Sequence, residues 1–146
     1  GVNRTEVDTI LFCESTNNKI LRWKHEVASE FLYNNEKILF IPDVLMELQL
    51  KDKQFLGFIE YDTGSENLRN KTDFPIIYNK LINYKRFKSS KLWVGYYKYF
   101  PVILLVTEDD KRIPYFNRKC QELGLEGYGI YYENYTDFLT HLANMV

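Results

Sequence analysis

The sequence predicts a single α/β domain in which a mixed β-sheet carries helices on both faces. Two alternating runs around a short polar link, over residues 44–50 and 55–61, indicate a central β-hairpin. After this hairpin, segments with helical periodicity alternate with apolar segments of strand length. The 146 residues, 45% hydrophobic and 27% charged, are enough for one hydrophobic core. We therefore expect residues 1–146 to form one domain.

Ahead of the hairpin, the sequence indicates one helix and one short strand. Val7, Ile10 and Leu11 recur at helical spacing, and two adjacent asparagines then break the pattern. The expected elements are a helix over residues 5–15, a strand over residues 20–25 and a turn at Asn34 and Asn35. Residues 28–35 match neither period, so the element that they form is left open.

After the hairpin, helices and strands alternate. Asp73, with Pro75 two positions later, is a typical helix start, and Gly124 is a typical helix stop. The near-continuous apolar run over residues 101–107 is typical of a strand buried on both faces. The expected elements are a loop at 63–67, helices at 73–90, 113–123 and 136–145, and strands at 101–107 and 129–132.

Composition limits the classes of function. A net charge of −1 gives no global basic field, so attraction to nucleic acid would need a local patch. Cys13 and Cys120 lack the neighbouring ligands of a zinc site and suit a reducing compartment. No apolar run reaches the length of a membrane span, so we expect a cytoplasmic protein without a membrane partner. Because the chain opens Gly-Val-Asn, we also expect it to be a fragment of a longer protein.

Three acidic residues cluster at the open end of the predicted hairpin. A two-residue turn at Asp52 and Lys53 would pair Asp43 with Asp62 and would place both on the same face as Glu60. Carboxylates that close repel one another, and a divalent cation such as Mg²⁺ removes the conflict. The alternative is a solvated hairpin end with no ligand, and a slip of one residue would divide the cluster between the two faces.

Three short motifs follow one another along the chain. They are Ile41-Pro42-Asp43-Val44, Glu60-Tyr61-Asp62-Thr63-Gly64 and Lys80-Leu81-Ile82-Asn83-Tyr84, ahead of the apolar strand. Their order resembles the replication-relaxation family of plasmid and mobile-element proteins, within the PD-(D/E)xK superfamily. The resemblance covers residues 23–112 and implies a restriction-endonuclease-like core.

By this resemblance, Asp43 and Glu60 are the acids that bind Mg²⁺ or Mn²⁺. The sequence departs from the pattern at Asp62, which stands where the superfamily usually has a lysine. Asp62 is therefore a third candidate for metal binding and catalysis. Lys80, on the following helix, would supply the missing ammonium group and stabilise negative charge on the attacked phosphate. Glu26 resembles a further acid of the site or is a solvated glutamate.

Basic and aromatic residues interleave on and after that helix. Lys85, Arg86 and Lys88, together with Arg112 after the apolar strand, are candidates to contact DNA. The alternative is a solvated helix face above a core of aromatic side chains, with Arg112 as a surface residue.

The resemblance and the acidic cluster lead to three hypotheses. The first is a metal-dependent, nuclease-like domain that hydrolyses DNA phosphodiesters during plasmid replication. The second is a catalytically inactive domain of the same fold that binds DNA or a replication protein and regulates replication. The third is an unrelated α/β interaction module whose acids are ordinary surface residues. The expected partners are DNA, replication proteins and a second copy of the chain. The sequence has no nucleotide-binding glycine motif or nucleophile elbow, which disfavours nucleotide-triphosphate chemistry and acyl transfer.

Overall fold

The computed structural model describes residues 2–62 and 73–145, with side chains from residue 4 in the first range and from residue 76 in the second. Glu66 and the loop expected over residues 63–67 lie outside these ranges. None of the helices in the described ranges combines the length and the apolar character that crossing a membrane requires.

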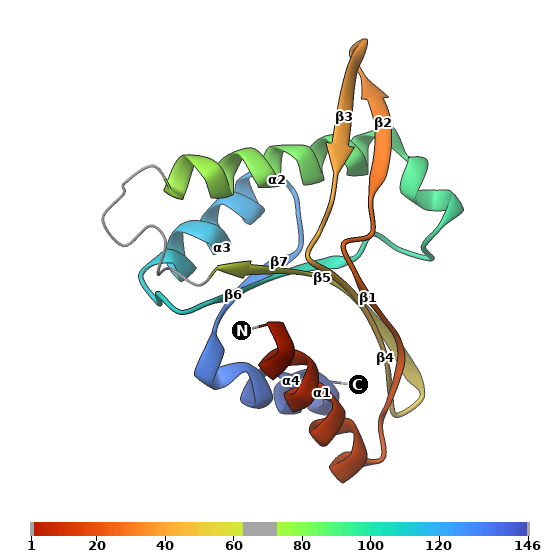
Figure 1. Ribbon diagram of the computed structural model, residues 1–146, viewed down its shortest axis with the longest axis vertical. Coiled ribbons are helices and arrows are strands. Elements are labelled where there is room, and N and C mark those ends of the chain that lie inside the picture. The colour runs from red at the N-terminus through yellow and green to blue at the C-terminus, as the bar shows by residue number, and fades with distance from the viewer. Residues whose placement is uncertain (1, 63–72, 146) are drawn as a thin grey trace.

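A five-stranded mixed sheet forms the centre of the molecule (Figure 1). Its strands, in spatial order, are β1 (Lys19–His25), β4 (Val44–Leu50), β5 (Lys53–Asp62), β6 (Val102–Thr107) and β7 (Gly127–Tyr131). The pairs β1–β4 and β4–β5 are antiparallel, and the pairs β5–β6 and β6–β7 are parallel. The switch to parallel pairing follows from the helices that connect these later strands.

Helices cover both faces of this sheet. They are α1 (Val2–Thr16), α2 (Asp73–Ser90), α3 (Arg112–Glu122) and α4 (Tyr135–Asn144), with short 3₁₀ turns at Leu92–Gly95 and Tyr132–Asn134. Figure 1 shows α1 and α4 together on one face and α2 and α3 on the other. Two buried apolar clusters fill the two interfaces. The predicted α/β class, with helices on both faces, is confirmed.

The central hairpin forms as predicted, but its register differs from the expected one. Leu50 faces Lys53, so the turn is at Lys51 and Asp52, one position earlier than expected. Lys51 has a φ of 58°, and its N–H donates to the Asn18 side chain at 2.9 Å. The pairing therefore shifts by two residues, and an even shift keeps every side chain on its predicted face.

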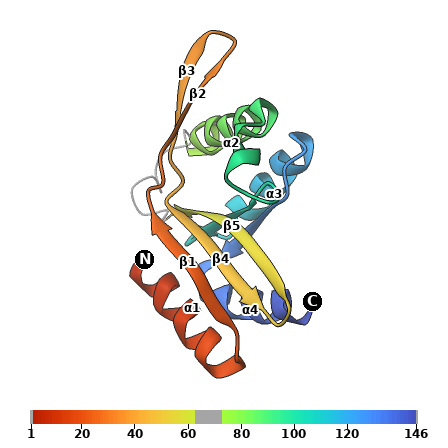
Figure 2. The same cartoon turned by 90° about the vertical axis from the view of Figure 1, so that its right-hand side faces the viewer.

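A second hairpin, β2 (Ser29–Tyr33) with β3 (Glu36–Phe40), projects away from the sheet beside α2 (Figures 1 and 2). The turn predicted at Asn34 and Asn35 is confirmed, and both residues have positive φ. Phe31, Ile38 and Phe40 on one face are buried in the cluster that includes α2. This hairpin resolves the segment that the sequence left open.

Candidate active site at the end of the central hairpin

Glu60 is the buried acid of the site. It lies on β5 with only 4% of its surface exposed. Its Oε1 accepts a hydrogen bond from Nζ of Lys80 at 3.1 Å, and its Oε2 accepts one from the Tyr84 hydroxyl at 3.0 Å. Both carboxylate oxygens therefore have a donor, as a buried charge requires.

Helix α2 delivers both of these donors. Lys80 and Tyr84 are four residues apart and so lie on one face of the helix. Ile77, Leu81 and Tyr84 are buried and seat that face on the sheet. The Lys80 side chain, at the border of this stripe, is 52% exposed. Lys80 therefore reaches the hairpin end from the helix, as predicted, while about half of its side chain stays exposed.

Asp43 lies beside Glu60, just before β4 begins. Continuing the β4–β5 ladder by one position places Asp43 opposite Glu60. Its Oδ2 accepts the backbone N–H of Tyr61 at 2.7 Å, and its carbonyl accepts the N–H of Glu26 at 3.0 Å. These bonds hold the Asp43 carboxylate at the strand end, at the level of Glu60.

The electrostatics of the site reflect burial and crowding. Burial raises the pKa of Glu60 above its usual value, Lys80 opposes that rise, and the Asp43 carboxylate adds to it. Burial by itself would lower the pKa of Lys80, but the attraction of Glu60, Asp43 and Asp62 raises it overall. Lys80 therefore stays protonated at neutral pH.

Asp62 lies two residues further along β5 and has different partners. Its Oδ1 pairs with the Arg112 guanidinium, and its Oδ2 accepts the Thr107 hydroxyl at 2.9 Å. Arg112 is 4% exposed and also pairs with Asp109 at 3.5 Å. Asp62 and Arg112 thus form a buried ion pair between β5 and the start of α3.

The arrangement of the acids corrects the expectation of three converging carboxylates. Glu60 and Asp62 share a face, as predicted, but Arg112 occupies the side of Asp62 where an ion was expected. In the described ranges, no three His, Cys, Asp or Glu side chains are grouped closely enough to hold a metal ion. Of the described residues, Asp43 and Glu60 are therefore the two that could hold a cation at this site, with further ligands from water or substrate.

Two carboxylates are sufficient for that purpose. Mg²⁺ is commonly bound by one or two carboxylates together with waters and substrate phosphates. Asp43 and Glu60 supply oxygen ligands of the right chemistry, and the repulsion between them is the kind that a cation relieves. The donor set fits a divalent cation.

Two hollows adjoin these residues. One, of about 220 Å³, is lined by residues that include Glu60, Lys80, Asn83 and Tyr84. The other, of about 290 Å³, is lined by His25, Glu26, Asp43 and Tyr61. Glu26, the additional acid suggested by the sequence, therefore lies in the same hollow as Asp43.

The four predicted DNA contacts do not form one patch. Lys88 donates to the Gly124 carbonyl at 2.8 Å, on the α3 side of α2. Arg86 lies over the Tyr33 ring at 5.6 Å, on the side of the second hairpin. Lys85 is half-buried, near Gly124. Arg112 is inside the protein rather than on a surface open to DNA.

Sequence reasoning missed two functional groups of this region. Tyr84 was predicted as part of a motif and of the apolar stripe of its helix, but the bond from its hydroxyl to Glu60 was not predicted. The signal was present, because Tyr84 follows Lys80 by four residues on the same helix. The pairing of Arg112 with Asp62 joins residues 50 positions apart and carries no local signal.

Comparisons with known proteins provide one family and one solved structure. A family model described as replication-relaxation matches residues 1–103, which include Asp43, Glu60 and Lys80. The crystal structure of protein VC1899 from Vibrio cholerae is similar over 97% of this chain, with 15% sequence identity and a TM-score of 0.48. This chain spans about a third of the length of that protein, since the match covers 32% of it. No curated protein matches the sequence.

Proposed function

The chain belongs to the replication-relaxation family, and from that premise we propose that it acts on DNA during the replication of a plasmid or mobile element. We propose further that it is a nuclease-like domain that uses a divalent metal ion. The observation that carries this proposal is the meeting of Asp43, Glu60 and Lys80 at one strand end, with Lys80 at 3.1 Å from Glu60.

Each residue has a distinct task in this proposal. Asp43 and Glu60 would hold the cation, which, when bound, polarises a phosphodiester and activates water. Lys80 would donate hydrogen bonds to a phosphate oxygen and stabilise the negative charge that develops there. Its half-exposed side chain and rotatable ammonium group would allow it to turn from Glu60 to substrate. Tyr84 would keep Glu60 oriented throughout.

Asp62 and Arg112 take a supporting role rather than the catalytic and DNA-contact roles first expected of them. Their ion pair, with Thr107 and Asp109, ties the end of β5 to β6 and to the start of α3. Because Glu60 is two residues away on the same strand, this network fixes the backbone that presents it. The missing lysine of the third motif position would thus be replaced by Lys80, as the sequence suggested.

A second function is favoured by the charge balance of the site. Glu60 is paired with Lys80, and Asp62 is paired with Arg112, so most of the negative charge is already compensated within the protein. A domain of this kind would bind DNA or a replication protein and regulate replication without cutting DNA.

A nicking assay on supercoiled plasmid with Mn²⁺ separates the two functions. The first function requires nicking by the wild type that is lost in Glu60→Gln and in Lys80→Ala. Lys53→Ala is the matched control, because Lys53 is exposed at the opposite end of β5 and should retain nicking. Salt-sensitive plasmid binding without nicking would favour the second function. Neither nicking nor binding would exclude both.

A further inference from the structure

A groove runs between the second hairpin and α2. The hollow at its outer end measures about 380 Å³ and is lined by residues 36–39 of β3 and by Asn79, Ile82, Asn83 and Arg86 of α2. Leu39 and Asn83 also line the hollow that contains Glu60 and Lys80. The two hollows therefore adjoin one another at Leu39 and Asn83, and the groove lies beside the candidate active site.

One wall of the groove is the edge of a β-strand. Within the described ranges, β3 pairs only with β2, so its other edge has no partner strand. Tyr33 and Glu36 form the hydrogen-bonded pair that closes the two-residue turn. From that pair on, non-hydrogen-bonded and hydrogen-bonded pairs alternate along the two strands. This alternation turns the backbone N–H and C=O groups of Lys37 and Leu39 toward the open edge.

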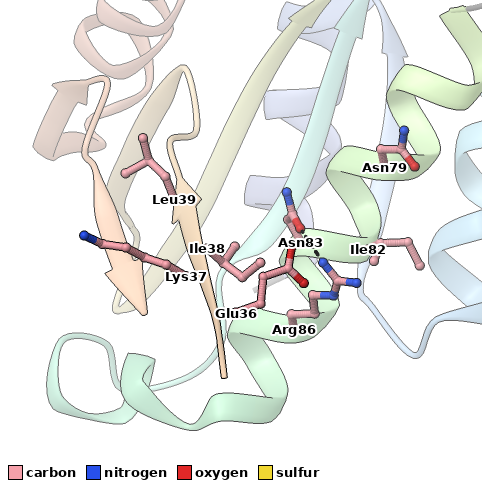
Figure 3. Close-up of a pocket in the computed structure, with 8 residues that line it drawn as sticks. All are labelled: Glu36, Lys37, Ile38, Leu39, Asn79, Ile82, Asn83 and Arg86. Atoms are coloured by element: carbon pink, nitrogen blue, oxygen red, sulfur yellow. Dashed lines mark hydrogen bonds between the residues drawn. The ribbon is translucent and has the colours of Figure 1, made fainter. Parts of the chain in front are cut away.

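The side chains confirm which part of β3 borders the groove. Figure 3 shows Glu36 and Ile38 directed toward α2, while the side chains of Lys37 and Leu39 point away from it. Lys37 pairs with Glu30 on that outer face at 2.9 Å. Since Lys37 and Leu39 nevertheless line the hollow, their backbone is the part that faces it. The groove therefore offers unpaired strand amides and carbonyls.

The other wall is one face of α2. Asn79, Asn83 and Arg86 recur at helical spacing and line the groove together with Ile82 (Figure 3). The stretch from Asn79 to Arg86 is about 10 Å long at ~1.5 Å per residue, which matches three residues of extended chain at ~3.4 Å each. This wall offers one apolar side chain, two amides and a guanidinium group.

We propose that this groove binds an extended peptide segment of a partner protein, which adds to β3 as a third strand between the hairpin and α2. Strand addition draws its affinity from backbone hydrogen bonds and its specificity from pockets for alternate side chains. The chemistry of the α2 wall selects a segment with an apolar side chain at Ile82 and an acidic one at Arg86, whose only side-chain hydrogen bond in the described ranges is a long one of 3.5 Å to Asn83.

A single nucleic-acid strand fits this groove less well. A nucleic-acid strand lacks the alternating N–H and C=O groups that pair with the open edge of β3, so it cannot use that wall of the groove. A peptide seated along β3 would also end beside Lys80, so it would compete with substrate at the candidate active site.

A linear twelve-residue peptide library displayed on phage tests the proposal, followed by fluorescence anisotropy with a selected synthetic peptide. Leu39→Pro removes an amide from the open edge, and we expect it to weaken binding about tenfold. Leu32→Pro is the matched control, since Leu32 faces Lys37 in a non-hydrogen-bonded pair, so its N–H points to the outer edge of β2 and its loss should leave the affinity unchanged. Asn83→Ala combined with Arg86→Ala leaves β3 intact and should also weaken binding about tenfold.

Three results would overturn the proposal. The first is that no peptide is enriched, or that the selected peptide binds Leu39→Pro as well as it binds the wild type. The second is that a dT12 oligonucleotide, rather than a peptide, binds and loses affinity in the Asn83→Ala and Arg86→Ala variant. The third is a dimer in sedimentation that Leu39→Pro converts to a monomer, because the open edge would then belong to a second copy of the chain. Since none of these results involves metal or nicking, the nuclease proposal is tested separately.

Discussion

Two carboxylates on the same face of β5, Glu60 and Asp62, are held in contrasting ways. Glu60 is paired with a lysine whose side chain is half exposed and with a buried tyrosine. Asp62 is paired with an arginine that is itself buried and bonded to a second acid. A lysine ammonium group is a compact charge on a flexible stem, whereas a guanidinium group forms a fixed fork. Glu60 therefore has an exchangeable partner suited to chemistry, whereas Asp62 has a permanent partner suited to structure.

The largest effect on the free energy of unfolding is expected from breaking the ion pair between Asp62 and Arg112. Arg112→Ala leaves Asp62 buried without its cation and should lower the free energy of unfolding by ~3–5 kcal/mol, measured by urea denaturation. The double variant Asp62→Asn with Arg112→Met should recover part of that loss, because replacing a buried ion pair with neutral groups is often nearly neutral. If the free energy of unfolding of Arg112→Ala lies within about 1 kcal/mol of the wild-type value, the Asp62–Arg112 pair is no more structural than the Glu60–Lys80 pair.

The next largest effect on stability is expected from removing the Tyr84 hydroxyl, which donates to Glu60. Tyr84→Phe removes the donor to Oε2 of a buried carboxylate, and we expect a loss of ~1–3 kcal/mol in the free energy of unfolding. Tyr78→Phe, on the exposed side of the same helix, is the control and should change stability little. Equal effects from the two substitutions would show that the Tyr84 hydroxyl contributes nothing to holding Glu60.

Lys80→Ala should have a smaller effect on stability, of about 1 kcal/mol, since the ammonium group is half exposed and its attraction is screened by solvent. Glu60 keeps its bond from Tyr84 in this variant and takes up a proton more readily. If Lys80 is the exchangeable partner, the same variant loses plasmid nicking. A loss of stability as large as that of Arg112→Ala would make Lys80 a structural residue instead.

The smallest expected effect is a dependence of the free energy of unfolding on pH that comes from Glu60. The folded-state pKa of Glu60 lies above its usual value of 4.5, so the folded protein holds this proton more tightly than the unfolded chain. The free energy of unfolding of the wild type, relative to that of Glu60→Gln, should therefore fall as pH rises from ~4.5 and level off once Glu60 is ionised. Urea denaturation of both proteins between ~pH 4 and ~8 measures this difference. A difference that rises with pH would mean that Lys80 more than compensates for burial.

Local sequence patterns predicted the elements that present the site. The alternation of residues 44–50 and the periodicity of residues 73–90 match β4 and α2 residue for residue. The common face of Glu60 and Asp62 also followed from the strand period, even though the turn was one position off. The turn was misplaced because Lys51 adopts a positive φ and bonds to Asn18, which is 33 residues away.

Other features depend on contacts distant in sequence. Strand β3 was missed because its residues 36–40 alternate only weakly, with Leu39 exposed although apolar. The partner of Asp62 was missed because nothing near it in the sequence indicates Arg112. The acids, in contrast, were identified from their residue types and their spacing in the sequence. Only the fold shows that Glu60 pairs with Lys80 while Asp62 pairs with Arg112.

Calorimetric titration with Mn²⁺ tests the central claim, that Asp43 and Glu60 hold a cation, most directly. Asp43→Asn is the informative variant, because an asparagine oxygen can still accept the Tyr61 N–H and so preserve the strand end. Glu47→Gln is the control, since Glu47 lies on the same strand and is paired with Arg22. We expect the wild type and Glu47→Gln to bind one Mn²⁺ ion, and Asp43→Asn and Glu60→Gln to lose that binding. Absence of binding by the wild type, or equal loss in Glu47→Gln, would contradict the account.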